Sequence, residues 1–327
     1  MVAFILVRLA QAVPVLLAVG LIAFAMFRFV GDPVTIMLGQ DYTEASRAAL
    51  IHHLGLDQPF IVQYAKFMAN AAHGEFGVSY RLARPVMELI VERAPATLEL
   101  AFAAALFALV IGVPMGVYTG IYRNRPLSRL FMVISLIGVS LPTFLIGILL
   151  ILVFSVLLGW LPSFGRGEVV KLGYWSTGLL TKSGLQALVL PAITLGLFQM
   201  TLIMRLVRAE MLEVLRSDYV KFARARGLPN RAVHFGHALK NTLVPVITIV
   251  GLQLGGIIAF SIVTETVFQW PGLGLLFVQS VQVADVPVMA AYLMLISVVF
   301  VVINLIVDLL YFAVDPRLRM ARAVARA

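Results

Sequence analysis

Polar residues that could do chemistry gather in one stretch of the chain, residues 216–245, RSDYVKFARARGLPNRAVHFGHALKNTLVP. It combines a single acid, Asp218, with six bases, which are Arg216, Lys221, Arg224, Arg226, Arg231 and Lys240. Tyr219, Phe222 and Ala223 follow the i, i+3, i+4 spacing that places side chains on one face of a helix. Gly227, followed by a Leu-Pro pair, is expected to end that helix. A short basic helix with an apolar face and a turn is typical of a docking surface, not of a catalytic site.

Motifs for nucleotide, metal or covalent chemistry are missing from the sequence. It contains no Gly-x-x-x-x-Gly-Lys-Ser/Thr run, so ATP hydrolysis would have to occur on separate subunits. It has no cysteine, and His-Glu-x-x-His and Gly-x-Ser-x-Gly are absent. His52 and His53 are adjacent and point to different faces of a helix, and His237 lies three residues after His234. We predict no catalytic residue and no metal site.

Composition identifies a membrane protein. The 327 residues are 61% hydrophobic and 13% charged, with a mean hydropathy of +1.00. Soluble domains have about 45–50% apolar and about 25% charged residues. The net charge of +9 follows membrane topology, so we expect a lipid environment and no nucleic acid partner.

An all-α polytopic membrane protein with six transmembrane helices is the predicted fold. Runs of about 20 apolar residues are long enough to cross a hydrocarbon core of about 30 Å. The six runs are residues 9–30, 98–121, 130–158, 185–207, 243–267 and 288–314.

Charge distribution predicts the orientation and the domains. With both termini in the cytoplasm, most of the 25 Lys and Arg residues lie on the cytoplasmic side, as the positive-inside rule requires. An external helical subdomain is then expected at 31–97, with an N-cap at Asp41 and short helices over 45–54, 59–72 and 85–93. The remaining divisions are an N-terminal helix at 1–30, a five-helix core at 98–314 with a cytoplasmic loop at 208–242, and a basic tail at 315–327.

The basic stretch resembles the cytoplasmic coupling loop of permease subunits in binding-protein-dependent ABC transporters, of the dipeptide, oligopeptide and nickel branch. The residues that match the family pattern are Asp218, Tyr219, Ala223, Arg224, Ala225, Gly227, His237, Ala238, Asn241 and Pro245. Phe222 and Arg226 stand where the family has Thr and Lys. Further matches are Gly31-Asp32-Pro33, Leu54-Gly55-Leu56-Asp57, Gly74-Glu75-Phe76-Gly77, Arg84-Pro85-Val86, Ala96-Thr97-Leu98-Glu99-Leu100, residues 264–274 and Asp315-Pro316-Arg317.

This resemblance implies a type I ABC importer permease that moves di- or oligopeptides inward by alternating access. Its partners would be a homologous second permease, two ABC ATPases and an external substrate-binding protein. The chain itself would carry no cofactor, because ATP and magnesium bind the ATPases. The implied location is the bacterial cytoplasmic membrane. The implied ATPase-coupling residues are Asp218, Tyr219, Lys221, Phe222, Ala223, Arg224, Ala225, Gly227 and Leu228.

Polar residues inside the predicted spans are candidates for the substrate pathway. They are Gln199, Gln253 and Glu265, although Glu265 could instead cap the external turn after its helix. Nickel, glutathione and glycosides are alternative substrates, since close relatives in the family use them. An alternative of another class is an ion-coupled secondary transporter, which would need a relay of intramembrane acids. Glu265 and Asp308 are few and far apart for such a relay.

Overall fold

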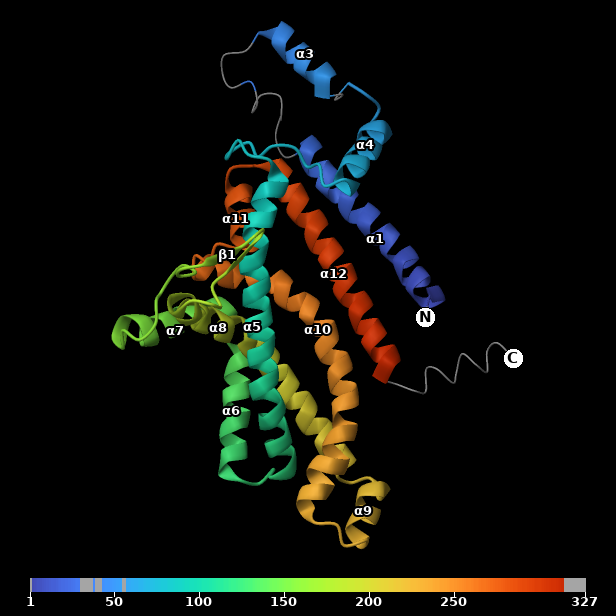
Figure 1. Ribbon diagram of the computed structural model, residues 1–327, viewed down its shortest axis with the longest axis vertical. Helices are drawn as coiled ribbons and strands as arrows, with labels where there is room; N and C mark the ends of the chain where they lie inside the picture. The colour runs from blue at the N-terminus through green and yellow to red at the C-terminus, as the bar shows by residue number, and fades with distance from the viewer. Residues whose placement is uncertain (1, 30–37, 39–42, 55–56, 315–327) are drawn as a thin grey trace, which may run out of the picture. The chain divides into compact units, whose positions relative to one another are not determined.

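The computed structural model describes residues 2–29, 38, 43–54 and 57–314, and the regular secondary structure of this part of the chain is helical except for one pair of short strands (Figure 1). The helices are α1 (Val2–Phe29), α3 (Glu44–Leu54), α4 (Phe60–Ala72), α5 (Val86–Ile121), α6 (Pro126–Ser140), α7 (Thr143–Leu150), α8 (Lys182–Val214), α9 (Asp218–Ala225), α10 (Leu239–Val267), α11 (Leu273–Gln282) and α12 (Val286–Val314). Two π-helical stretches, η1 (Ile151–Leu157) and η2 (Ala232–Ala238), and the paired strands β1 (Val170–Leu172) and β2 (Trp175–Thr177) complete the order. The predicted cap Asp41, the Gly31-Asp32-Pro33 motif, Gly55-Leu56 and the basic tail lie outside the described residues.

The chain divides into two compact units. The first unit comprises Met1–Ala96, Lys171–Ser176 and Pro271–Val302, and the second comprises Thr97–Val170, Thr177–Trp270 and Ile303–Ala327.

In the first unit, aromatic rings join α4 to α1. Phe24 of α1 meets the rings of Phe60, Tyr64 and Phe67 at centroid distances of 5.1–5.9 Å. The hydroxyl of Tyr64 donates to the carbonyl of Leu17 at 2.7 Å. The external helices expected at 45–54 and 59–72 are thus present as α3 and α4.

The helix expected at 85–93 is not a separate element. It forms the first turns of α5, a continuous helix of 36 residues that also contains Pro95 and Pro114. Each proline removes one N–H donor, but neighbouring helices can satisfy the freed carbonyls in a membrane, so the helix continues. The prediction of a separate short helix at 85–93 was therefore wrong.

In the second unit, a stripe of glycines allows α5 to approach α8 closely. Gly112, Gly116 and Gly120 follow one another at i, i+4, i+8. A Cβ atom at Gly116 would lie 2.6 Å from Cβ of Val207 and 2.7 Å from the carbonyl oxygen of Met204. Small residues of this kind let membrane helices pack backbone to backbone.

The predicted third span, residues 130–158, is broken. It consists of α6 followed by α7 and η1, which bend by 114° relative to α6. Leu141 is extended, with φ −94° and ψ 137°, and Pro142 starts the next helix. The proline ring disfavours the α region for the residue before it, and here Leu141 takes the extended conformation that breaks the helix.

Four helices among the described residues are long and apolar enough to cross a membrane, or five if the bent pair counts as one span. They are Ile5–Phe27, Val86–Ile121, Lys182–Val214 and Val286–Leu309. α10 covers the predicted fifth span, 243–267, and its Gly255–Val267 part is apolar. All six predicted regions are therefore helical.

Candidate functional site

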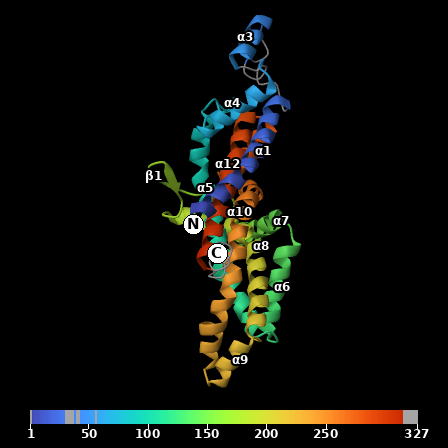
Figure 2. The same ribbon diagram turned by 90° about the vertical axis from the view of Figure 1, so that its right-hand side faces the viewer.

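The helix predicted in the basic stretch is α9, which lies at the end of the second unit reached by α8 and α10 (Figures 1 and 2). Val220 and Ala223 are buried on one side of α9 and pack with Val233 of η2. This small apolar cluster holds the helix on the rest of its own loop.

Tyr219 and Phe222, which the sequence grouped with Ala223 on one face, lie at the surface instead, because Val220 and Ala223 form the buried face of α9. Phe222 is 65% exposed and Tyr219 is 41% exposed. The guanidinium carbon of Arg226 lies 5.9 Å from the centroid of the Phe222 ring. The exposed part of α9 therefore combines two aromatic side chains with the positive charge of Arg226, which suits a partner surface with apolar and acidic groups.

Gly227 ends α9 as the sequence predicts. Its φ of +78° lies in the left-handed region, which glycine enters without steric cost. The N–H of Leu228 donates to the carbonyl of Ala223 at 3.3 Å, and that of Gly227 donates to Arg224 at 2.9 Å. These bonds close the last turn and fix the direction in which the chain leaves the helix.

A side-chain hydrogen bond connects the two halves of the basic stretch. Nδ2 of Asn241, in the first turn of α10, donates to the hydroxyl oxygen of Tyr219 at 2.8 Å. The same nitrogen donates to the carbonyl of His237 at 3.3 Å. α9 is thus attached to a helix of the membrane region by a direct contact, which the sequence alone did not reveal.

The charged and titratable side chains of this loop differ in what they contribute to its stability and net charge. Lys221 and Asp218 form an ion pair at 2.8 Å that is exposed to solvent, and such pairs contribute little to stability. Partial burial, together with the positive charge of Arg224, lowers the pKa of His234. His234 is therefore neutral at pH 7, and the charge of the loop comes from its Lys and Arg residues.

Two of the three predicted pathway residues come together. Gln199 of α8 and Gln253 of α10 both approach the face of Gly256, where an added Cβ would lie 4.0 Å from Nε2 of Gln199 and 3.9 Å from Oε1 of Gln253. Glu265 follows Gln253 by 12 residues on α10, or about 18 Å along the helix axis. It does not share their surroundings.

Glu265 belongs to a separate buried network. Its side chain is fully buried, and its Oε1 accepts hydrogen bonds from Thr97 at 2.7 Å and from Ser261 at 3.1 Å. Its carbonyl accepts the N–H of Trp270, also buried, at 2.9 Å. Glu265 thereby joins the start of the second unit to the turn that follows α10.

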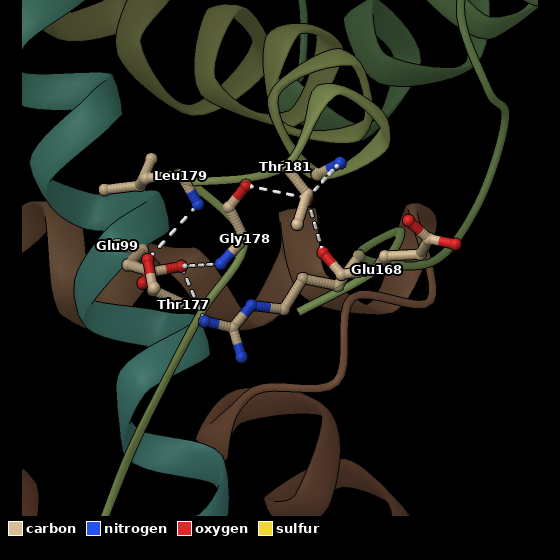
Figure 3. A network of polar contacts seen from close by, with 8 residues as sticks. Glu99, Glu168, Thr177, Gly178, Leu179 and Thr181 are labelled. Carbon is tan, nitrogen blue, oxygen red and sulfur yellow. Dashed lines mark hydrogen bonds and ion pairs between the residues drawn. The ribbon is translucent and has the colours of Figure 1, made fainter. Parts of the chain in front are cut away.

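A buried ion pair lies in the same unit. Oε2 of Glu99 accepts from the guanidinium of Arg166 at 2.5 Å and from the N–H of Gly178 at 3.3 Å (Figure 3). The Arg166 guanidinium also lies 6.0 Å from the centroid of the Trp270 ring. Glu99 and Arg166 are 5% and 6% exposed, so the pair is shielded from water.

Sequence reasoning missed this pair. Glu99 appeared there only as part of the Ala96–Leu100 motif, and no role was predicted for Arg166. The available signal was weak: a lone acid in an apolar run and a lone base in a stretch rich in Gly and Ser. Among the described residues, no group of three or more His, Cys, Asp or Glu side chains could hold a metal ion.

Comparison with known proteins gives one consistent result. A family described as the binding-protein-dependent transport system inner membrane component matches residues 112–320, and the N-terminal component of the same kind of system matches residues 1–101. The dipeptide transport system permease protein DppB of Alkalihalophilus pseudofirmus is 38% identical over 332 residues, which cover 98% of this chain and 100% of that protein. The glutathione transport system permease protein GsiC of Escherichia coli K12 is 38% identical over 317 residues, or 97% of this chain and 98% of that protein.

A solved structure supports the same fold. The MetNI methionine ABC transporter in an inward-facing conformation matches with a TM-score of 0.56 and 23% identity, over 70% of this chain and 97% of that one. The type I importer permease fold expected from the sequence is thus confirmed. The chain belongs to the family of binding-protein-dependent transport system inner membrane components, and it is a multi-pass membrane permease subunit of an ABC importer.

Proposed function

We propose that this chain is one of two permease subunits that together move di- or oligopeptides into the cell by alternating access. The similarity to DppB along almost the whole chain is the observation that carries this proposal. Glutathione is a second candidate substrate, since GsiC is as similar, and it is itself a small peptide. Nickel and glycosides are alternatives that rest only on the resemblance of the sequence motifs to the permease family.

The loop at 208–242 is proposed to dock on an ATPase subunit. In support, α9 exposes Tyr219 and Phe222, while its buried residues Val220 and Ala223 pack against the rest of the loop. The glycine turn and the Tyr219–Asn241 bond make the loop stiff enough to transmit a push from the ATPase to α10. Such a push would reorient the membrane helices around the substrate pathway.

The remaining components follow from this role. Two ATPases would bind and hydrolyse ATP with magnesium, a homologous permease would complete the pore, and an external binding protein would deliver the peptide. The chain would lie in the bacterial inner membrane with both termini in the cytoplasm. It would perform no catalysis of its own.

The test of this function is a paired substitution in the purified complex. Phe222→Glu replaces an exposed aromatic at the centre of the proposed docking face, so the chain should fold while ATPase binding and peptide uptake fall at least tenfold. Tyr122→Glu is the matched control, because Tyr122 is 45% exposed but lies in the turn between α5 and α6. It should leave both quantities unchanged. Wild-type ATPase binding by Phe222→Glu would contradict the docking assignment.

A further inference from the structure

Gln199 is a buried amide with an unused acceptor. Its side chain is only 5% exposed, and within the described part of the chain its Oε1 accepts no hydrogen bond. A buried polar atom without a partner costs about 1–3 kcal/mol, so nearly all such atoms in folded proteins are paired. An unpaired amide oxygen inside the membrane region therefore needs a reason.

The surroundings of Gln199 supply a second amide and a glycine. Gln253 reaches the same side of Gly256, where an added Cβ would lie in ordinary van der Waals contact with Oε1 of Gln253 at 3.9 Å and Nε2 of Gln199 at 4.0 Å. Because Gly256 has no side chain, no Cβ of its own covers these two amide atoms on this face of α10. Gln253 and Gly256 are half-buried, so this place has access from the surface of the second unit.

The helix segments that carry the two amides are largely buried. Met200 and Ile203 on α8, and Ile257 on α10, are buried neighbours in sequence of the two amides and Gly256. In apolar surroundings a hydrogen bond is electrostatically stronger than in water.

We propose that Gln199 and Gln253, with Gly256 between them, bind a peptide bond of the substrate as it crosses the membrane. Each carboxamide offers an N–H₂ donor and a carbonyl acceptor, which match the C=O and N–H of a peptide bond. Neither carries charge, so the site reads the backbone and tolerates any side chain. This inference rests on the proposed function and names the contact through which a peptide, rather than a metal ion, would be recognised.

The test uses the whole complex, with both permeases, the ATPases and the binding protein, in proteoliposomes supplied with tritiated trialanine. The measured quantity is trialanine imported per ATP hydrolysed at a saturating concentration of binding protein. Gln199→Leu and Gln253→Leu each remove one amide while keeping similar size, and each should lower this ratio by about three- to tenfold, as the loss of one hydrogen bond implies. Stimulation of ATP hydrolysis by loaded binding protein should stay within about twofold of wild type.

Gly256→Ala tests the same place without removing an amide. The added methyl group would be in ordinary contact with the two amide atoms at 3.9 and 4.0 Å, so it would cover them and hinder a substrate from reaching them. It should lower import per ATP even if Gln199→Leu fails to assemble. Thr194→Val is the matched control on α8, because the Thr194 hydroxyl is buried and already donates to the carbonyl of Leu190 at 2.8 Å.

The outcomes distinguish a failure of the amide site from a failure of the proposed peptide transport. If wild type imports trialanine and Gly256→Ala and Gln253→Leu do so at the wild-type ratio, the amide site is wrong and the peptide function stands. If wild type hydrolyses ATP in response to its binding protein but imports no trialanine, peptide transport and the amide site both fail. Reduced import per ATP in the three variants, with Thr194→Val unchanged, supports the site.

Discussion

At the scale of single residues, the buried pair of Glu99 and Arg166 has the largest expected energy. Removing one member of a buried pair leaves the other charge without compensation, at a cost of about 3–5 kcal/mol. Replacing both members by apolar side chains of similar volume costs far less, because no charge is left uncompensated. The pair also fixes Gly178, so its loss would free the chain before α8.

A double-mutant cycle tests this. Glu99→Leu and Arg166→Met should each lower the midpoint of thermal unfolding in detergent strongly, while the double variant should be more stable than either single variant. This result follows because the double variant buries no uncompensated charge. Additive losses in the double variant would show that the two side chains act independently.

His234 is expected to make the loop sensitive to acid. Its pKa in the folded loop lies below the ordinary 6.5, so the unfolded loop binds protons more readily. The stability contributed by neutral His234 is complete above about pH 6.5 and falls as the pH drops from there toward the folded pKa.

Hydrogen exchange measures this sensitivity. Between pH 7.5 and pH 5.5, the amides of residues 229–240 should lose protection after correction for the intrinsic exchange rate. His234→Gln cannot take up a proton and should remove this pH dependence while keeping a polar side chain. A pH dependence that persists in His234→Gln would assign the effect to another group.

At the scale of elements, the approach of α5 to α8 depends on glycine. Gly116→Ala would place a Cβ 2.7 Å from the backbone oxygen of Met204, so the two helices would have to separate. Overpacking of this kind costs about 1–3 kcal/mol, and the unfolding midpoint should fall. Gly236→Ala is the control, because it adds the same atom in η2, where nothing lies within 4 Å. Equal stability of the two variants would exclude a close α5–α8 contact.

At the scale of the whole molecule, the orientation in the membrane can be tested on a chain that contains no cysteine. Tyr174→Cys and Phe222→Cys place single thiols at residues that are 94% and 65% exposed. With both termini in the cytoplasm, a membrane-impermeant maleimide added to intact spheroplasts should label Tyr174→Cys and spare Phe222→Cys. Permeabilised cells should show labelling of both, and the reverse pattern in intact cells would invert the proposed topology.

The sequence by itself determined the features that depend on local interactions. The length of apolar runs placed helices in all six predicted regions, and the spacing around Tyr219 placed α9 with its glycine turn. Capping bonds and helix amphipathicity are made within a few residues, so their signals are continuous in the sequence. The matched motifs also identified the family, which the comparisons confirm.

Only the tertiary structure decided which distant residues meet. Glu99 and Arg166 are 67 positions apart, and Thr97 and Glu265 are 168 apart. Their contacts depend on how whole helices pack, and no local pattern records that. The break at Leu141 and the continuity of α5 through Pro95 depend likewise on which neighbours satisfy the backbone around each proline. The meeting of Gln199 with Gln253 at Gly256 belongs to the same class, because it exists only where α8 and α10 pack together.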